Sequence, residues 1–572
     1  MNARLDDAHA ASARTHEVFN QTPPLADYNL YASNLALREA VTREGAEWAD
    51  TELLKRGSEL GSAEMFERGI IANKNPPELK LFDATGNRRD AVEFHPSYHE
   101  LMRYIKRHGA SGGPWVEPRA GAHVARAAFF MMMGEIDNGT LCPTTMTYAV
   151  VPALQNEPKL AEWVSKAVSP DYDHRFIPGL EKRGVTFGMG MTEKQGGSDV
   201  RANTTAAAYV GESEWGSEYR ITGHKWFFSA PMCDGFLILA QTGSGGNHTP
   251  TCFFLPRFGP DGKQNDIRLQ RLKDKVGDRS NAGSEVEFCD ARAWRVGEES
   301  RGIQTILEMG TYTRLDCVLG TSSQMRAALS QAMHHASHRQ VFGRRLIEQP
   351  MMQNVLADLA LESEAATVLG MRLARAFDRK TDEQEALLAR VLTPVAKYWV
   401  CKRGSIFGGE AMEVWGGNGY VEDGPLARIF RQMPLNSIWE GSGNVMGLDT
   451  LRALSKNPRV AEALEAELAP ARGLDKHFDT HVSELKQMLK LLAAQPAELE
   501  FRARELMQRI ALAVQGSLLL QHSPDAVAET FCASRFAADG KWGAAYGVLP
   551  APTDWHITKI LARSWPACGL NA

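Results

Sequence analysis

Apolar residues in the N-terminal part of the chain recur every three or four positions, which is the spacing of amphipathic α-helices. The pattern starts near Asn34 and is carried by Leu35, Leu37, Val41, Trp48, Leu53 and Leu54. Two prolines at 76 and 77 interrupt it, because proline cannot continue a helix. Residues 79–94 are then predicted to form a small hairpin around Gly86, and residues 121–133 a helix apolar enough to lie in a core.

The periodicity changes to two between about residues 185 and 296, where short apolar runs alternate with Gly, Asn and Asp. These runs predict strands at residues 219–222, 225–229, 236–241, 251–255, 267–269 and 285–288. Helical spacing returns at Ile303 and continues to about Ser455, before a boundary at Asn457 and Pro458. The remaining chain is predicted to form helices at residues 482–493, 497–520 and 526–538, with a Gly/Pro-rich stretch at 543–552.

The predicted architecture is mainly α with an inserted β-domain. Its four blocks span residues 1–184, 185–296, 297–456 and 457–572. A chain of 572 residues is too long for one core, since a domain usually holds about 100–200 residues. Residues 16–24 contain two prolines and no periodicity, so we expect them to lie as an extended arm on another surface.

Composition narrows the classes of function. A formal net charge of −5 and a pI near 6.4 argue against an overall basic nucleic-acid binder but leave room for a local basic patch. The eight cysteines are scattered without a C-x-x-C pair, which disfavours a zinc site or a disulfide framework and favours a reducing cytoplasm. The polar start of the chain has no apolar h-region and no long apolar run follows, so neither export nor membrane insertion is expected.

Residues 188–200, Gly-Met-Gly-Met-Thr-Glu-Lys-Gln-Gly-Gly-Ser-Asp-Val, are too rich in Gly, Thr and Ser for a helix interior. Gly196 and Gly197 let backbone amides approach a ring or a phosphate closely, and Thr192 and Ser198 add hydroxyl groups. The stretch therefore suits a cofactor-binding loop. Taken alone, an ordinary surface turn between strands is the more common explanation.

Four further motifs follow in order: Gly-His-Lys-Trp-Phe-Phe-Ser-Ala at 223–230, Arg-Gln-Val-Phe-Gly at 339–343, Gly-Gly-Asn-Gly-Tyr at 416–420 and Ile-Trp-Glu-Gly-Ser-Gly-Asn at 438–444. With these motifs the chain resembles the acyl-CoA dehydrogenase flavoprotein family, and within it the AidB-type branch, which is linked to the bacterial response to DNA alkylation. The resemblance implies a helical domain, a β-barrel-like domain and a helical bundle, plus an extra C-terminal helical domain. It also implies FAD as cofactor and weak dehydrogenase activity on an acyl-CoA similar to isovaleryl-CoA.

Glu440 is the candidate catalytic base. From the residues alone, a glutamate in a turn before an apolar helix is more often a favourable charge near a helix N-terminus. In the family that the chain resembles, the matching glutamate removes the α-proton of an acyl thioester while a hydride leaves the β-carbon for the flavin. Such a base needs a raised pKa and a site poor in water, which the indole of Trp439 would help to provide. Some members take the base from an earlier helix, but the matching positions here are Thr313 and Arg314.

The resemblance implies two sets of FAD contacts. The set from one subunit comprises Met189, Met191, Thr192, Gly197, Ser198, Phe227, Phe228, Ser229, Ile438, Ser442 and Asn444. The set that reaches the adenine and diphosphate from a neighbouring subunit comprises Arg339, Phe342, Gln349, Gly416 and Gly417. Sharing one FAD between two chains implies a homo-oligomer, expected to be a tetramer. A Phe-Phe pair in a strand is otherwise a core feature, which leaves the flavin contact of Phe227 open.

The chain departs from the family pattern at three positions. Lys194 replaces a proline, and Glu413 and Asn444 each replace a glutamine near the FAD. A carboxylate beside phosphates repels them, so Glu413 is left out of the predicted site. His334 and His338 are four apart, but no third ligand lies at a recognisable spacing, so a solvated helix face is expected rather than a metal site.

Duplex DNA is the partner that the AidB-type branch implies, bound without strong sequence preference through the C-terminal block. The candidate residues are Arg452, Lys456, Arg502, Arg504 and Arg509. From the residues alone, such groups are usually a solvated face, because positive and negative charges nearly cancel beyond Lys456. The alternative is a catabolic acyl-CoA dehydrogenase of fatty-acid or branched-chain metabolism. The extra C-terminal block, which ordinary members of the family lack, favours the DNA-associated protein.

Overall fold

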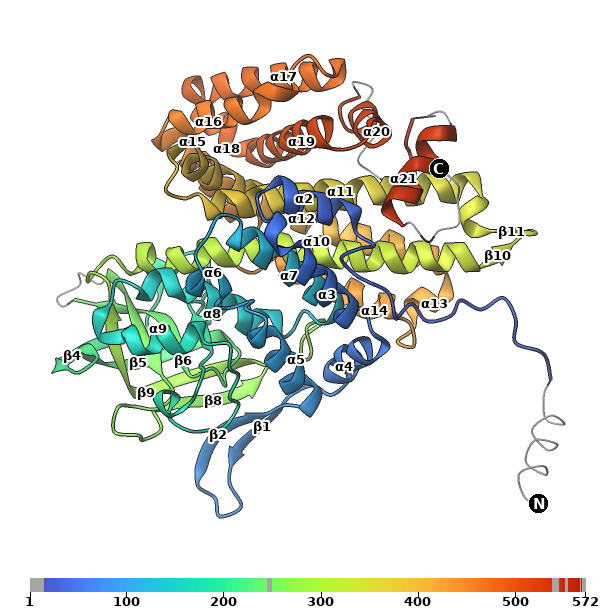
Figure 1. Cartoon of the computed structure of the whole chain (residues 1–572). Coiled ribbons are helices and arrows are strands. Elements are labelled where there is room, and N and C mark those ends of the chain that lie inside the picture. Colours follow the sequence, from blue (N-terminus) through green and yellow to red (C-terminus); the bar gives the residue numbers. More distant parts are fainter. Residues whose placement is uncertain (1–14, 244–248, 538–544, 551–553, 566, 568–572) are drawn as a thin grey trace, which may run out of the picture.

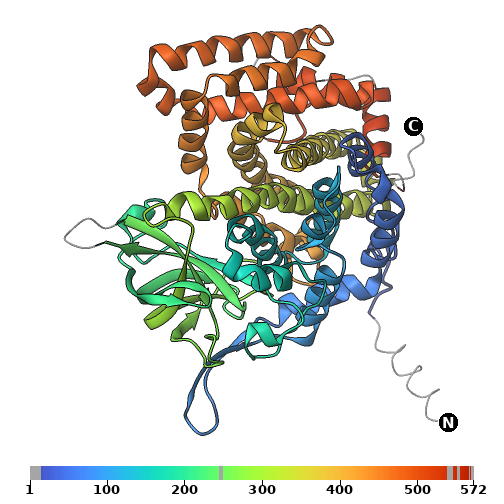
Figure 2. The same ribbon diagram turned by 60° about the vertical axis from the view of Figure 1, so that its left-hand side comes forward.

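The computed structural model describes residues 15–243, 249–537, 545–550, 554–565 and 567 (Figure 1). The expectations for residues 1–14 and for the ends of the 543–552 stretch lie outside this part. The long helix α10 (Gly302–His338) crosses the middle of the molecule. The β-domain lies on one side of α10 and the C-terminal helices lie on the other, as Figures 1 and 2 both show. In the described residues, no helix combines the length and apolarity needed to cross a membrane.

The first block is helical apart from one hairpin. Its helices are α2 (Leu35–Arg43), α3 (Asp50–Leu60), α4 (Ala63–Lys74), α5 (Pro96–Arg107), α6 (Gly113–Val116), α7 (Ala122–Ile136), α8 (Leu141–Leu154) and α9 (Ala161–Val168). Strands β1 (Glu78–Phe82) and β2 (Arg88–Glu93) pair antiparallel, which confirms the predicted hairpin. Helix α7 is buried along almost its whole length, which confirms the predicted core helix.

The second block is a closed β-domain. Its strands are β3 (Phe187–Gly190), β4 (Ala206–Ser213), β5 (Gly216–Ser229), β6 (Gly235–Thr242), β7 (Thr249–Pro256), β8 (Ile267–Leu272) and β9 (Gly283–Val296). Strands β6, β4, β5, β9 and β7 pair in turn, and β7 pairs back onto β6 to close the barrel. This confirms the predicted fold class, a β-barrel-like domain inserted between helical blocks.

The third block is a bundle built on α10. Its other elements are β10 (Gln340–Val341), β11 (Arg344–Arg345), α11 (Pro350–Asp378), α12 (Glu383–Val414), α13 (Gly417–Tyr420), α14 (Pro425–Gln432) and α15 (Gly443–Lys456). Helix α10 packs against α7, α8, α11 and α12, so it joins the first and third blocks. It begins at a glycine because a Cβ on Gly302 would lie 2.3 Å from the carbonyl carbon of Thr251 on β7.

The C-terminal block packs on α12 and α15. Its helices are α16 (Arg459–Leu468), α17 (Lys476–Ala494), α18 (Pro496–Phe501), α19 (Ala503–His522), α20 (Asp525–Arg535) and α21 (Asp554–Ser564). The single helix predicted at 497–520 is wrong, because the backbone leaves helical geometry at Arg502. The break lets Ala503 pack against Gly447 of α15, so tertiary packing overrides local propensity.

The N-terminal arm lies against the end of α10, as predicted for an extended segment. The side chain of Asn20 donates to the carbonyl of Gln340 and accepts from its amide, both at 2.8 Å. His334 Nε2 lies 2.9 Å from the carbonyl oxygen of Pro23. The arm therefore covers His334, and the expectation of a solvated helix face is wrong there. No group of three metal-binding side chains occurs among the described residues.

The Gly-rich loop after β3 is anchored by a buried ion pair. Lys225 Nζ lies 2.8 Å from Glu193 Oε1, and both side chains are fully buried. Glu193 also accepts hydrogen bonds from the backbone amides of Thr204 and Thr205. Burial alone would raise the pKa of Glu193, but the charge of Lys225 and these hydrogen bonds lower it to about 2.

We predict that Glu193→Gln strongly destabilises the protein. Removing one partner of a buried pair leaves the Lys225 charge uncompensated, which typically costs about 3–5 kcal/mol of unfolding free energy. The measurement is chemical denaturation at neutral pH. The control is Glu287→Gln, an exposed position of the same domain, where a change within about 0.5 kcal/mol is expected. Equal unfolding midpoints for the two variants would contradict a structural role of the pair.

Candidate active site

Glu440 lies in a turn just before α15, with a φ angle of 58°. Residues other than glycine rarely adopt this left-handed conformation, which costs on the order of 1–3 kcal/mol and persists only where the surroundings enforce it. Such strain gathers at functional sites. The conformation of Glu440 therefore needs an explanation in its neighbours.

Two cations hold the backbone around Glu440. Lys397 Nζ, on α12, donates to the carbonyl of Trp439 at 2.6 Å and to that of Gly441 at 2.5 Å. Arg314 Nε, on α10, donates to the carbonyl of Glu440 itself at 3.0 Å. Three consecutive carbonyls are thus bound by two buried or nearly buried charges. We call this arrangement the carbonyl clamp. It fixes the turn in the conformation that glutamate does not favour.

The carboxylate of Glu440, the predicted base, is held by a hydrogen bond. Its Oε2 accepts a 2.6 Å hydrogen bond from the hydroxyl of Thr313. Burial raises its pKa above the usual carboxyl range, while the Thr313 hydrogen bond and the charges of Arg314 and Lys397 act in the opposite direction. A raised pKa makes the carboxylate more basic, as a proton-abstracting group requires.

Three residues were not identified from the sequence as partners of the Glu440 turn, namely Thr313, Arg314 and Lys397. Thr313 and Arg314 were considered only as alternative bases. Lys397 carried one signal that could have found it, because it is a charge within the apolar run that α12 buries. A buried lysine needs acceptors, but sequence alone does not say that they lie more than forty residues away.

Cys142, at the start of α8, brings the β-domain to this site. Its thiol is hydrogen-bonded with Ser229 and lies within the electrostatic reach of Glu440. Burial foremost raises the pKa of Cys142 to about 12, so the thiol stays neutral. Ser229, a predicted flavin residue, and Glu440, the predicted base, are therefore both in the neighbourhood of Cys142.

The predicted flavin residues of the β-domain divide into two groups. The half-buried or exposed group includes Thr192, Gly197, Ser198 and Phe227, and Phe227 itself is 55% exposed. The side chains of Met189 and Phe228 lie in the β-domain core. Successive residues of a strand point to opposite faces, so Phe227 and Phe228 cannot both present their rings to a cofactor. Only backbone atoms of the two buried residues remain for one.

The helix that follows Glu440 begins with free backbone amides. Helix α15 has Ser442 as its N-cap, without a side-chain capping bond and with no acidic residue in its first turn. Such an N-terminus attracts phosphate groups. With the exposed Phe227 ring and the anchored Gly-rich loop, the residues present fit a flavin dinucleotide. Asn444, a predicted contact, accepts a 2.9 Å hydrogen bond from Arg504.

The second predicted FAD set lies near the other end of α10. Arg339 donates to the carbonyl of Asn20, and Gln349 to that of Val341. Phe342 forms the tip of the β10–β11 hairpin and is 99% exposed. Gly416 and Gly417 are also exposed, and a Cβ on either would meet no atom within 4 Å. From Thr313 to Arg339 the helix rises roughly 40 Å at 1.5 Å per residue. The two FAD sets are therefore well separated within one chain.

The predicted DNA residues are not one uniform group. Arg452 and Lys456 are exposed on α15, with Arg452 3.9 Å from Asp449. Arg502 forms ion pairs with Glu498 and Glu505, and Arg509 forms ion pairs with Glu484 and Glu505. Arg504 is exposed and its Nε donates to Asn444, a predicted flavin contact, so it differs from the ion-paired Arg502 and Arg509.

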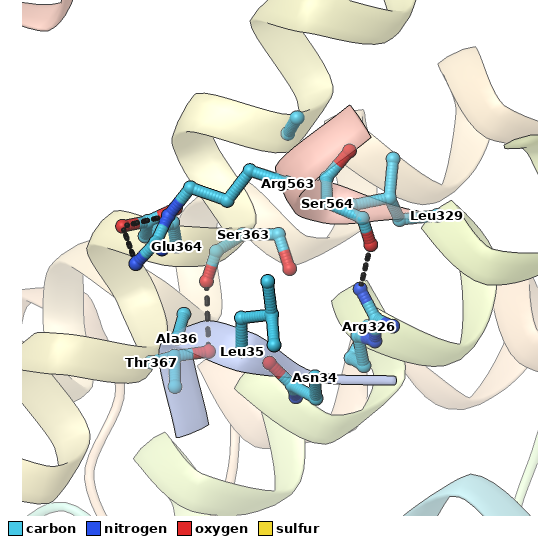
Figure 3. Close-up of a pocket in the computed structure, with 11 residues that line it drawn as sticks. Asn34, Leu35, Ala36, Arg326, Leu329, Ser363, Glu364, Thr367, Arg563 and Ser564 are labelled. Atoms are coloured by element: carbon cyan, nitrogen blue, oxygen red, sulfur yellow. Dashed lines mark hydrogen bonds and ion pairs between the residues drawn. The ribbon is translucent and has the colours of Figure 1, made fainter. Parts of the chain in front are cut away.

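Two cavities of the described part lie away from Glu440. One of about 20 Å³ is enclosed by α2, α10, α11 and α21 (Figure 3). There Arg326 donates to the carbonyl of Ser564, and Arg563 forms an ion pair with Glu364. These contacts hold α21 against α10 and α11. The other, of about 380 Å³, lies between the β1–β2 hairpin, α5 and the β-domain. Neither is lined by a residue of the predicted site.

Three family models match consecutive parts of the chain. They are the adaptive response protein AidB N-terminal domain at residues 20–174, the acyl-CoA dehydrogenase middle domain at 188–291 and the acyl-CoA dehydrogenase C-terminal domain at 300–455. The chain is 50% identical to AidB of Escherichia coli (strain K12) over 522 residues, which are 91% of this chain and 94% of the relative. The chain belongs to the acyl-CoA dehydrogenase family. Members are FAD-dependent oxidoreductases, and FAD is the cofactor.

Solved structures of the acyl-CoA dehydrogenase family share the architecture. Caenorhabditis elegans ACDH-11, in complex with C11-CoA, matches with a TM-score of 0.82 and 25% identity, covering 96% of each chain. An acyl-CoA dehydrogenase of Bacillus anthracis complexed with FAD has a TM-score of 0.61 and 15% identity over 82% of this chain and 83% of its own, which shows the fold alone. The C-terminal block is therefore also present in a protein crystallised with an acyl-CoA.

We predict that Thr313→Val shifts the acidic limb of flavin reduction to higher pH. The Thr313 hydrogen bond stabilises the charged carboxylate, so its loss raises the pKa of Glu440 further. The base acts only when deprotonated, so the acidic limb of the pH profile should move up by about one pH unit or more. A hydrogen bond to a charged group contributes about 1.5–3 kcal/mol, and one pKa unit corresponds to about 1.36 kcal/mol. The measurement is the pH profile of stopped-flow flavin bleaching by an acyl-CoA.

Thr311→Val is the control for this experiment, because among the described residues the Thr311 hydroxyl donates only to the carbonyl of Leu307 in its own helix. Its profile should match that of the wild type. An acidic limb that stays in place in Thr313→Val would contradict the role of this hydrogen bond.

Proposed function

We propose that the protein dehydrogenates an acyl-CoA thioester, with Glu440 as the base that removes the α-proton. The observation that carries the proposal is the carbonyl clamp, in which Lys397 and Arg314 hold Glu440 in an unfavourable backbone conformation. A structural carboxylate would need no such support. Family membership supplies the reaction class, and the complex of ACDH-11 with C11-CoA supports an acyl-CoA as substrate.

The residues of the chain divide the work in this proposal. Glu440 takes the α-proton on a carboxylate oxygen, and Thr313 keeps that carboxylate oriented and charged before the transfer. Trp439, fixed by a 2.9 Å hydrogen bond from its indole to Asn436, limits the access of water. FAD, when bound, supplies the acceptor for the hydride that leaves the β-carbon. The electron pair of the α C–H bond would become the second bond between Cα and Cβ, and the pair of the β C–H bond would leave with the hydride to FAD, so the product is an α,β-unsaturated thioester.

We further propose that FAD is shared between two copies of the chain in a homotetramer. The two FAD sets lie roughly 40 Å apart along α10, so a cofactor that meets both must join two chains. The surface around Arg339 supports an interface, because Phe342, Met351 and Tyr420 are all more than 80% exposed. Monomeric proteins rarely leave such large apolar side chains fully open to water.

A second candidate function is binding of duplex DNA in the alkylation response of the cytoplasm. The observation that favours it is the exposed pair Arg452 and Lys456, four apart at the end of α15. In the described residues Lys456 has no ion pair, and Arg452 has only a 3.9 Å contact with Asp449. The similarity to AidB supports it. The C-terminal block itself does not decide, since ACDH-11 shares the architecture. All cysteines of the described part are free, in keeping with a reducing compartment.

We predict that Glu440→Gln lowers the rate of flavin reduction by an acyl-CoA by about 10² or more, the scale expected for loss of a positioned general base. The amide keeps the shape of the side chain, so the flavin spectrum should be unchanged. Anaerobic stopped-flow bleaching with a panel of acyl-CoAs measures the rate. Glu67→Gln, an exposed carboxylate on α4, is the control and should react like the wild type. Undiminished reduction in Glu440→Gln would move the base elsewhere.

We predict that charge reversal at Arg452 and Lys456 reduces binding of duplex DNA and the steepness of its salt dependence. Each lost phosphate contact lowers the log–log slope by about 0.9. Arg502→Glu should have less effect, because Arg502 is already paired with two glutamates. Fluorescence anisotropy with a random duplex measures binding, and Lys80→Glu on the β1–β2 hairpin controls for net charge. If the wild type binds no duplex at low salt, the catabolic dehydrogenase becomes the better description.

A further inference from the structure

Helix α19 of the C-terminal block packs closely against α15, the helix that follows Glu440. Helix α19 begins at Ala503 and packs its first turn against α15. A Cβ on Gly447 of α15 would lie 3.3 Å from both the Cβ of Ala503 and the Cε of Met507. The two helices therefore approach as closely as a glycine allows, and the start of α19 has a fixed position relative to the Glu440 turn.

Arg504 extends from this contact over the first turn of α15. Its Nε donates to Asn444 Oδ1 at 2.9 Å. A Cβ added to Gly443 would lie 3.7 Å from one terminal nitrogen of Arg504. The same Cβ would lie 3.2 Å from ring carbons of Tyr398. The guanidinium thus stands beside the free backbone amides at the N-terminus of α15.

Arg504 is exposed and places a positive charge beside the N-terminus of α15. A cation near a helix N-terminus is opposed by the helix dipole, and the first turn of α15 contains no acidic residue to offset it. No ion pair between Arg504 and a carboxylate occurs among the described residues, whereas its neighbours Arg502 and Arg509 each have two glutamate partners. In the described residues, two sources of positive potential therefore lie together, the N-terminus of α15 and the Arg504 guanidinium.

We propose that Arg504 is a residue of the FAD site, contributed by the C-terminal block. Through Nε it fixes Asn444, and its two terminal nitrogens bind the diphosphate of the cofactor. This inference rests on the proposed FAD site and extends it, because the block then completes the cofactor site as well as any DNA surface. A guanidinium can hold two phosphate oxygens at once, so one side chain suffices for both tasks.

The test is a titration of the apoprotein with FAD, in which the quenching of flavin fluorescence measures binding. Arg504→Gln should raise the Kd for FAD by about 10- to 100-fold, the usual effect of losing a hydrogen bond to a charged group. Arg504→Lys keeps the charge but not the fork, so its Kd should lie between. The matched control is Arg502→Gln, two residues away on the same turn and paired with glutamates, which should leave the Kd unchanged.

A double-mutant cycle separates this role from general damage to the C-terminal block. Asn444→Ala and Arg504→Gln should be strongly non-additive in FAD affinity, because each removes the other's partner. The FAD affinity of the wild type should also weaken more steeply with salt than that of Arg504→Gln. Equal thermal midpoints of the apoproteins exclude misfolding, and Arg504→Lys carries the test if Arg504→Gln does not fold.

The outcomes are distinguishable. Wild-type protein that cannot bind FAD would overturn the proposed function itself. Wild-type protein that binds FAD, with Arg504→Gln binding equally well, would overturn only the role of Arg504. Equal weakening by Arg502→Gln and Arg504→Gln would also overturn it, because the effect would then belong to the helix and not to one guanidinium.

Discussion

The carbonyl clamp is the interaction on which the rest of this site depends. Glutamate in a left-handed conformation is unstable by itself, and Lys397 and Arg314 hold it by binding three successive carbonyls. The clamp draws on α10 and α12, which belong to the core of the bundle. Arg314 is in turn held by Asp449 of α15 at 2.9 Å. The base is therefore positioned by rigid helices and not by the loop that carries it.

The same clamp governs the electrostatics of the site. The two cations hold the backbone, yet their charges also favour the ionised carboxylate against the effect of burial. Without these charges, only the Thr313 hydrogen bond would oppose the effect of burial on the pKa of the carboxyl group. Position and basicity are thus coupled, so a substitution of either cation alters both together. This coupling explains why the functional unit extends well beyond the glutamate.

Much of the fold and part of the site could be predicted from the sequence. The β-barrel insertion followed from a period of two, and Glu440 from its motif. The break at Arg502 could not be predicted, because it arises from packing of α19 on α15. Phe228 was predicted to contact the flavin, yet its side chain is buried, because successive residues of a strand face opposite sides. Lys397 was missed, and Arg504 was considered only as a DNA residue, because the contacts of both arise only in the assembled helices.

The N-terminal arm has a consequence for labelling. Asn20 is bound to Gln340 at the base of the hairpin that presents Phe342, so Val18 and Phe19 lie exposed close to this surface. A fluorophore attached at position 18 would stand at the rim of the expected contact between copies, whereas one on α21 would stand near α2 and α11. The first label would change its emission as subunits associate, and the second would serve as an internal reference within the same chain.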